Sequence, residues 1–144
     1  MTDRQEWLSL LATSKPQTLA VLWADTGLAP DYVMLRKAET GSVMVRGRAG
    51  SVGKAFNLGE MTVTRASLRL ADGTVGHGWC QGRDRKQAET AALLDALMQG
   101  PDATKLEAAV FKPLRDARTE RRRSRSERAA ATKVDFFTMA RGDG

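Results

Sequence analysis

The chain has 144 residues, which suits one compact domain with an appendage and is too short for two ordinary domains. Its 42% hydrophobic and 28% charged residues are typical of globular rather than disordered proteins. The longest purely apolar run covers residues 19–24, whereas a membrane-spanning helix needs about 20 residues. A single cysteine, Cys80, cannot close an internal disulfide or form a cysteine-only metal site. Because the first residues contain no apolar signal core, we expect a cytoplasmic protein that is not secreted through a signal peptide.

The net charge of +6 is unevenly distributed along the chain. Residues 1–100 hold 12 Lys and Arg against 10 Asp and Glu, whereas residues 101–144 hold 11 against 7. A basic block of this kind attracts an acidic partner, which can be nucleic acid, an anionic membrane or an acidic protein surface. The arginines of this block are Arg115, Arg118, Arg121, Arg122, Arg123, Arg125 and Arg128.

Two short helices are predicted before residue 28. Apolar residues between Trp7 and Leu11 recur at helical spacing behind Asp3, which predicts the first helix. Pro16 suits the first turn of a second helix, since proline lacks the amide hydrogen that this position does not need. Gly27 is placed as the end of that helix.

Residues 31–83 predict an antiparallel sheet of about four strands. A turn is predicted at residues 39–42, where Gly41 supplies the required glycine, and Asp72-Gly73 predicts the last hairpin. A slip in the alternation of the third strand is interpreted as a bulge near Arg65. The predicted strands are residues 32–38, 43–48, 60–70 and 74–81, and a glycine-rich linker covers residues 49–59.

A covering helix is predicted to begin at Asp84, which together with Gln87 three residues later resembles a capping box. Its apolar residues lie on one helical face, which we expect to cover one face of the sheet. The helix should end at residues 100–101. A further helical stretch begins near Ala103 and is interrupted at Pro113.

Between residues 115 and 128 the only apolar residue is Ala117, so this stretch cannot bury itself on its own domain. The expected fold is therefore α+β, with a small antiparallel sheet, N-terminal helices, a covering helix and an extended helical or irregular C-terminal arm. We expect a compact domain over residues 1–100, a basic helical arm over 101–133 and an apolar interaction tail over 134–144.

Two glycine motifs are near matches to nucleotide-binding loops, and both fail. Residues 47–55 resemble a phosphate loop, but Arg48 stands where glycine is required and Ala55 where a magnesium-binding hydroxyl is required. Residues 76–81 carry two glycines of the dinucleotide fingerprint but lack the third glycine and the helix that should open there.

Metal and nucleophile chemistry is not favoured by the spacing of the reactive residues. His77 and Cys80 are three apart in a predicted strand and should point to opposite faces, so they cannot bind one ion together without a bulge. The chain has one histidine and no Gly-x-Ser-x-Gly pattern. Composition and spacing therefore favour a chain without a complete active site of its own. The sequence leaves open a catalytic site made of two carboxylates. The acidic residues without an assigned role are Glu39 and Glu60.

The end of the chain carries two of its eight aromatic residues, Phe136 and Phe137. Burying one Phe side chain is worth about 1.5–3 kcal/mol, so leaving both in water together with Met139 is a standing cost. The tail must either fold back onto its own sheet or dock in another subunit, and the polar spacer before it favours docking. The hypothesised partner interface consists of Val134, Phe136, Phe137, Met139, Arg141 and Asp143.

Short motifs follow one another along nearly the whole chain. They are Ala38-Glu39-Thr40-Gly41, Leu58-Gly59-Glu60-Met61-Thr62-Val63-Thr64-Arg65, Asp72-Gly73-Thr74, Gly82-Arg83-Asp84, Ala88-Glu89, Asp95-Ala96-Leu97-Met98-Gln99, Val134-Asp135-Phe136-Phe137-Thr138-Met139 and Arg141-Gly142-Asp143. Together they resemble the PhnG family, the G subunit of the bacterial carbon–phosphorus lyase system of phosphonate degradation. The closing motif is the most specific of the set.

The resemblance implies a subunit of a cytoplasmic core complex with the H, I and J proteins, to which ATP-binding-cassette-type K and L proteins attach more loosely. It implies a reaction in which methylphosphonate replaces the adenine of MgATP to give α-D-ribose 1-methylphosphonate 5-triphosphate. The I subunit looks catalytic, and G, H and L are required beside it. The resemblance assigns no catalytic residue, cofactor or metal to this chain, since MgATP is a substrate of the assembled complex. We expect an accessory subunit that clasps the I subunit, without a membrane or nucleic acid as partner.

Two other interpretations stay open. One is a basic nucleic-acid-binding module, indicated by the arginine block, although that block lacks the aromatic residues on which bases usually stack. The other is a contributor of side chains to a shared phosphate site. The candidates for that role are Arg46, Arg48, Arg65 and Arg83.

Overall fold

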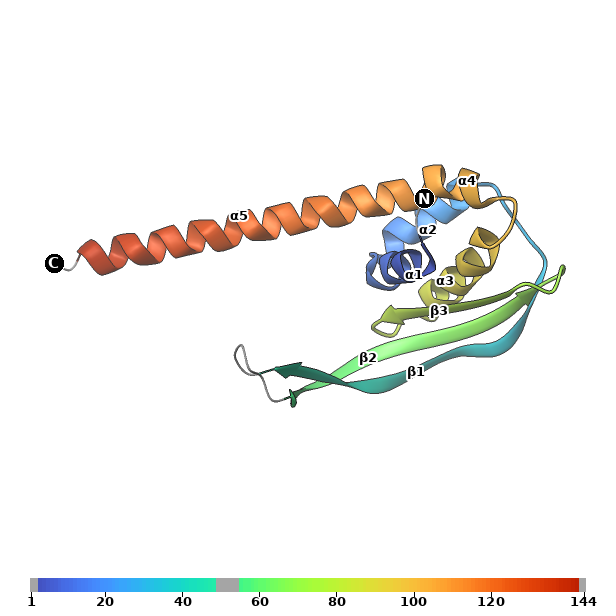
Figure 1. Cartoon of the computed structure of the whole chain (residues 1–144), viewed down its shortest axis with the longest axis horizontal. Helices are drawn as coiled ribbons and strands as arrows, with labels where there is room; N and C mark the ends of the chain where they lie inside the picture. Colours follow the sequence, from blue (N-terminus) through green and yellow to red (C-terminus); the bar gives the residue numbers. More distant parts are fainter. Residues whose placement is uncertain (1–2, 49–54, 143–144) are drawn as a thin grey trace.

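The computed structural model describes residues 3–48 and 55–142. The chain folds into helices and a three-stranded antiparallel sheet of order β1-β2-β3, which confirms the predicted α+β class. Figure 1 shows the helices gathered on one side of the sheet and one long helix that projects from this body. The elements are α1 (Arg4–Thr13), α2 (Pro16–Asp25), β1 (Tyr32–Arg48), β2 (Ala55–Leu70), β3 (Val75–Gln81), α3 (Arg85–Met98), α4 (Ala103–Leu106), a π-helical segment (Glu107–Phe111) and α5 (Lys112–Gly142).

Both N-terminal helices form where local signals predict them. A carboxylate oxygen of Asp3 accepts a hydrogen bond from the backbone N–H of Glu6 at 2.8 Å, which caps the first turn of α1. Pro16 opens α2. Gly27 follows the end of α2 with φ of 69°, a conformation that glycine adopts without steric cost.

The turn predicted at residues 39–42 is wrong, and the two short strands around it are one strand, β1. Residues 39–42 pair in sequence with β2, from Glu39 opposite Arg65 to Ser42 opposite Thr62. The reason is non-local: β2 is 16 residues long and offers hydrogen-bonding partners to the whole of β1, whereas a local hairpin would leave half of β2 unpaired. The sheet therefore has three strands, not four.

The register shift opposite Arg65 lies on β1, not on the strand where the bulge was predicted. Shifts near Arg65 occur between Met34 and Arg36 and between Arg36 and Glu39, and a third, far from Arg65, lies between Val45 and Arg46, whereas β2 pairs with β3 without a shift. The slip in the hydrophobic alternation of β2 has another cause. Val63 is buried on one face of the sheet and Leu68 on the other, so both phases of the strand carry apolar residues.

The predicted linker at residues 49–59 is in part a strand. Residues 55–59 belong to β2, where Arg46 pairs with Asn57 and Gly47 with Phe56. Residues 49–54 lie outside the described part of the chain. The Asp72-Gly73 hairpin is confirmed: Gly73 has φ of 94°, and a carboxylate oxygen of Asp72 accepts from the backbone N–H of Thr74 at 2.9 Å.

Helix α3 begins as predicted, with Asp84 accepting a hydrogen bond from the backbone N–H of Gln87 at 2.9 Å. The side chain of Gln87 does not return to Asp84. Its amide instead donates to the backbone carbonyls of Leu11 at 3.2 Å and Ser14 at 2.8 Å. Since these carbonyls end α1 without helical partners, the buried Gln87 fastens the first helix to the third.

The two glycines of β3 let the strand lie directly against α3. A Cβ atom on Gly76 would stand 2.0 Å from the carbonyl oxygen of Ala92, and one on Gly78 would stand 2.3 Å from the backbone nitrogen of the same residue. The side of α3 that faces the strand carries small side chains, among them Ala88 and Ala96, which permit this close approach. The glycine pair that resembles a dinucleotide fingerprint is thus a close-packing site between helix and strand.

Pro113 does not interrupt the helical chain, contrary to expectation. The preceding residues form a π-helical segment, in which the backbone N–H of Lys112 donates to the carbonyl of Glu107, five residues earlier. Proline has no amide hydrogen and its ring clashes with the carbonyl four residues before it, and the wider turn accommodates both effects. The segment also keeps Val110 and Phe111 in the core, and α5 then leaves the body with Leu114 as its anchor.

Replacing Gly76 tests the close contact between β3 and α3. We expect Gly76→Ala to lower the free energy of unfolding by roughly 1–3 kcal/mol or more, because its Cβ atom meets helix backbone that cannot turn aside. Urea unfolding of the purified chain measures the change. Gly41→Ala is the matched control: its Cβ atom meets nothing within 4 Å, so a change within about 0.5 kcal/mol is expected. Equal effects of the two substitutions would contradict the packing argument.

Candidate partner-binding surface

In the described residues, no helix layer covers the face of the sheet opposite α3. Strand pairing places side chains there in rows that cross all three strands. One row is Arg36, Ser67 and His77, and the next is Glu39, Arg65 and Trp79. We call this surface the open face. It mixes apolar side chains with exposed arginines, a composition that suits contact with another protein better than contact with water alone.

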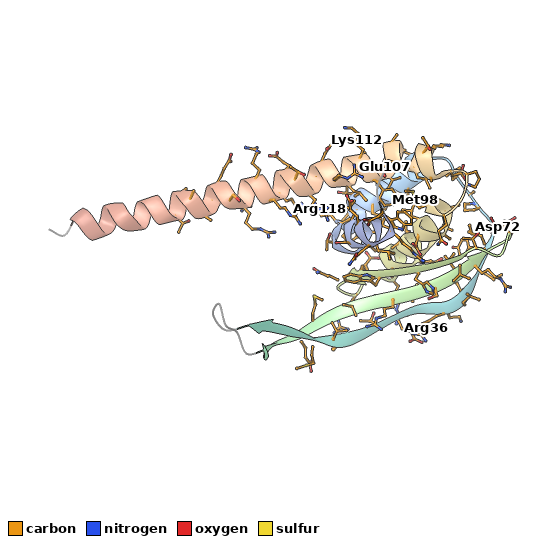
Figure 2. All side chains as sticks on the ribbon, in the orientation of Figure 1. Arg36, Asp72, Met98, Glu107, Lys112 and Arg118 are labelled. Carbon is orange, nitrogen blue, oxygen red and sulfur yellow. The ribbon has the colours of Figure 1, made fainter. Side chains whose placement is uncertain are left out.

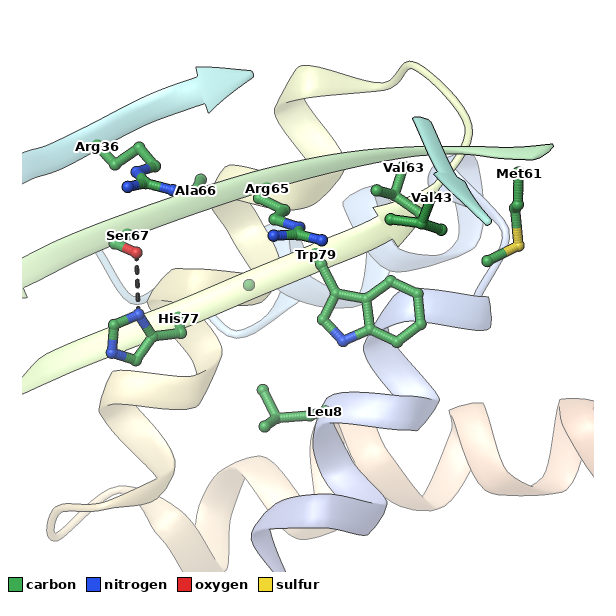
Figure 3. A pocket seen from close by; sticks show the side chains of 11 residues that line it. Leu8, Arg36, Val43, Met61, Val63, Arg65, Ala66, Ser67, His77 and Trp79 are labelled. Carbon is green, nitrogen blue, oxygen red and sulfur yellow. Dashed lines mark hydrogen bonds between the residues drawn. The ribbon is translucent and has the colours of Figure 1, made fainter. Parts of the chain in front are cut away.

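A depression of about 470 Å³ lies in the open face. Figure 3 shows the side chains that line it. Val63 forms its floor and is only 5% exposed, although it lies on the face away from α3. Arg36 and Arg65 extend beside the apolar floor, so the depression has a basic rim. Its apolar lining comes from Leu8, Val43, Met61, Val63 and Trp79.

Helix α1 supplies one wall of the depression through Leu8, and Asp95 holds the helix in place. The carboxylate of Asp95 is fully buried and accepts hydrogen bonds from the indole N–H of Trp7 at 2.8 Å and from the guanidinium of Arg4 at 2.8 and 3.1 Å. It also accepts from the backbone N–H of His77 in β3 at 2.8 Å. One carboxylate thus joins α1, α3 and the edge strand of the open face.

Two arginines, Arg4 and Arg115, form ion pairs with carboxylates of the body. The hydrogen bond to Asp95 and the attraction of its charge raise the pKa of Arg4, against an opposing effect of burial. Arg115 at the root of α5 behaves similarly: its hydrogen bond to Glu107 raises its pKa most, with a further bond to Glu6 on α1. These ion pairs fix the N-terminal helix and the long helix on one body.

His77 and Cys80 point to opposite faces of β3, as predicted. His77 lies on the open face with Nδ1 2.9 Å from the hydroxyl of Ser67. Cys80 is buried on the helix side, where burial and then the charge of Asp84 raise the pKa of its thiol. A thiol in such surroundings is protonated and weakly reactive. No cluster of three His, Cys, Asp or Glu able to hold a metal occurs within residues 3–48 and 55–142.

The structure describes the side chains of two of the four arginines predicted to contact phosphate, Arg65 and Arg83. Arg65 lies in the rim of the depression, whereas Arg83 is exposed beyond the end of β3. Arg46 and Arg48 are part of β1 near its end. Arg36 was not among the candidates, since nothing in its local sequence separates it from a solvated strand residue. Glu39, expected in a turn, lies instead in β1 opposite Arg65.

The predicted interface at the end of the chain lies on the last turns of α5. The helix continues to Gly142, so these residues extend an element that has already left the body (Figure 1). Asp143 lies outside the described residues. In the described ranges no helix is long and apolar enough to cross a membrane. The interface residues on α5 are Val134, Phe136, Phe137, Met139 and Arg141.

Comparison with known proteins gives two findings. A family model described as "Phosphonate metabolism protein PhnG" matches residues 2–142 of the chain. A curated relative from Rhizobium meliloti (strain 1021) is 41% identical over 143 residues, which cover 99% of this chain and 92% of the relative. That relative is named "Alpha-D-ribose 1-methylphosphonate 5-triphosphate synthase subunit PhnG".

Asp95→Asn tests whether one carboxylate holds the helix layer against the open face. We expect the free energy of unfolding to fall by about 2–4 kcal/mol, because an amide would turn an N–H group toward donors and leave the Arg4 charge unpaired. Urea unfolding measures the effect. Asp116→Asn removes an exposed carboxylate that pairs only with Lys112 at the surface, so a loss below about 1 kcal/mol is expected. A small loss for Asp95→Asn would contradict its role as a joint.

Proposed function

The chain belongs to the PhnG family of phosphonate metabolism proteins, and from this premise we propose that it is the G subunit of an α-D-ribose 1-methylphosphonate 5-triphosphate synthase within a carbon–phosphorus lyase complex. The observation that carries the proposal is the 41% identity to a subunit of that synthase across 99% of the chain. The matched residues include both the compact body and helix α5.

The proposed reaction belongs to the assembled complex. Methylphosphonate displaces adenine at C1 of the ribose of MgATP, and the product keeps the triphosphate on C5. In the proposal the I subunit holds the reacting groups, the G, H and L proteins are required beside it, and the J protein acts on a later intermediate. MgATP is then a substrate of the complex and not a cofactor of this chain, and the complex works in the cytoplasm.

The proposed role of this chain is accessory: it clasps a neighbouring subunit and supports the core. Two features support that role. The open face presents an apolar depression with a basic rim, which is a surface that a protein partner can dehydrate and fill. Helix α5 extends beyond the body and carries the apolar residues Phe136 and Phe137 near its end. We propose the I subunit as the partner of both surfaces, with the H, J, K and L proteins more distant.

Adenine release in a reconstituted complex tests the proposed function. With the H, I and L proteins, MgATP and methylphosphonate, we expect adenine release in the presence of the full chain and background release in its absence. A chain ending at Lys133 should lose roughly tenfold or more of the activity and of the co-purified I subunit, since two aromatic anchors are removed. Its urea midpoint should be unchanged, because Leu114 is the last buried core residue among those that the structure describes. Full activity without this chain would overturn the proposal.

A charge placed in the depression tests the open face. We expect Trp79→Glu, and independently Met61→Glu, to reduce co-purification of the I subunit by roughly tenfold or more, since either carboxylate would be buried in the interface. Val21→Glu is the control, because Val21 is 59% exposed on α2 and does not line the depression. Thermal melting of each purified variant separates lost binding from lost folding. Normal co-purification with both folded variants would place the I subunit elsewhere.

A further inference from the structure

Helix α5 separates its charges onto two faces. Successive residues of an α-helix are about 100° apart around its axis. The residues four, seven, eleven and fourteen positions after Leu114 therefore lie on the same face of the helix as Leu114. Leu114 is buried against the body, so its face is the one that α5 turns inward. The residues at those four positions are all arginines, and Arg122 lies beside Arg118. We call this set the arginine row; it consists of Arg118, Arg121, Arg122, Arg125 and Arg128.

Between residues 112 and 128 the carboxylates of this helix lie on the opposite face and are already paired. Arg123 lies on that side and bonds to Glu120 and to Glu127. Lys112 pairs with Asp116 at 3.3 Å. Each carboxylate of this face is therefore bonded to a cation of the same helix, and three carboxylates against two cations leave the face slightly acidic. No carboxylate in the described part of the chain pairs with the arginine row.

The arginine row continues the inward face of α5 past the edge of the body. Arg118, labelled in Figure 2, follows directly on the turn that carries Leu114, and both it and Arg121 are partly shielded, whereas Arg125 and Arg128 are exposed. Figure 1 shows the far end of the β1–β2 pair extending from the same side of the body as α5. A partner on the row would meet the helix and also approach the body beside it.

We propose that the arginine row docks an acidic helix of a partner protein, with Asp or Glu at the matching positions i, i+3 or i+4, and i+7. From Arg118 to Arg128 the row spans about 15 Å, close to three turns of a facing helix. Carboxylates match the planar fork of guanidinium groups, and each pair formed relieves the repulsion between neighbouring arginines of the row. The partner is another subunit of the complex if the proposed function holds, but the binding chemistry rests on α5 alone.

The same observations favour protein over nucleic acid. No aromatic residue lies between the arginines of the row to stack on bases. The row is confined to one side of α5, and Asp116, Glu120 and Glu127 on the other side would repel phosphates that wrap around the helix. A facing helix needs only the one side.

Two full-length variants with the same net charge test the proposal. In the row variant, Arg118, Arg121, Arg122, Arg125 and Arg128 are each replaced by Gln. In the control variant, five exposed cations of the body are replaced by Gln, namely Lys15, Lys37, Arg85, Lys86 and Lys105. Each variant loses five positive charges, which lowers the net charge from +6 to +1. Circular dichroism and thermal melting confirm that both are folded.

The probes are a fluorescein-labelled helical peptide with Glu spaced at i, i+3 and i+7, a peptide of the same composition with its Glu residues scattered around the helix, and a DNA duplex of similar length. Fluorescence anisotropy at physiological salt measures binding to each. We expect the natural chain and the control variant to bind the spaced peptide at least about tenfold more tightly than the row variant does, and more tightly than either binds the scattered peptide.

Four results would overturn the proposal: no binding of the spaced peptide by the natural chain, equal losses in the two variants, equal affinity for the two peptides, or tighter binding of the DNA duplex. The outcome is separable from that of the proposed function. Suppose that adenine release does not need this chain, but that the chain binds the spaced peptide through the row. The proposed function would then be wrong, and the proposed role of the row would stand. An active complex assembled with the row variant, together with no binding of the spaced peptide by the natural chain, would remove the proposed role of the row and leave the proposed function standing.

Discussion

The carboxylate of Asp95 is the interaction on which the arrangement of the molecule depends. It lies fully buried between α1, α3 and β3 and accepts hydrogen bonds from each of the two neighbouring elements. Such a group is costly to bury unless every lone pair finds a donor, so its partners tolerate little displacement. With the contact of Gly76 and Gly78 against α3, it fixes the helix layer on one face of the sheet. The open face and its wall at Leu8 follow from that placement.

Local signals predicted the parts of the fold that local physics decides. The caps at Asp3 and Asp84, the left-handed Gly27 and the Asp72-Gly73 turn each depend on a few neighbouring residues, and each stands as expected. The turn at residues 39–42 failed because its turn-forming composition was outweighed by the hydrogen bonds that distant β2 offers. Strand pairing is a non-local choice that turn composition alone does not reveal.

The sequence predicted the chemical character of the candidate surfaces better than their location in the fold. The depression joins Leu8 of α1 with β1, β2 and β3, and no spacing along the chain indicates that these segments meet. The arginine block was evident from composition, and its excess charge predicted an acidic partner. Its division into a paired face and an inward row depends on the burial of Leu114 against the body, which nothing in the local sequence indicates. The terminal interface residues remain a prediction, since only their place on α5 is known.

The π-helical segment at Glu107–Phe111 determines how α5 is rotated about its own axis relative to the body. Its bond from Lys112 to Glu107 encloses one more residue than an α-helical turn does. Regular α-helical winding of the same residues would instead turn the outer helix by about 100° around its own axis. The cationic side would then look away from the body while the composition of the helix stayed the same. The direction in which the arginine row faces is thus set by one wide turn, and substitutions that favour regular α-helical winding within these few positions should turn the row away from the body.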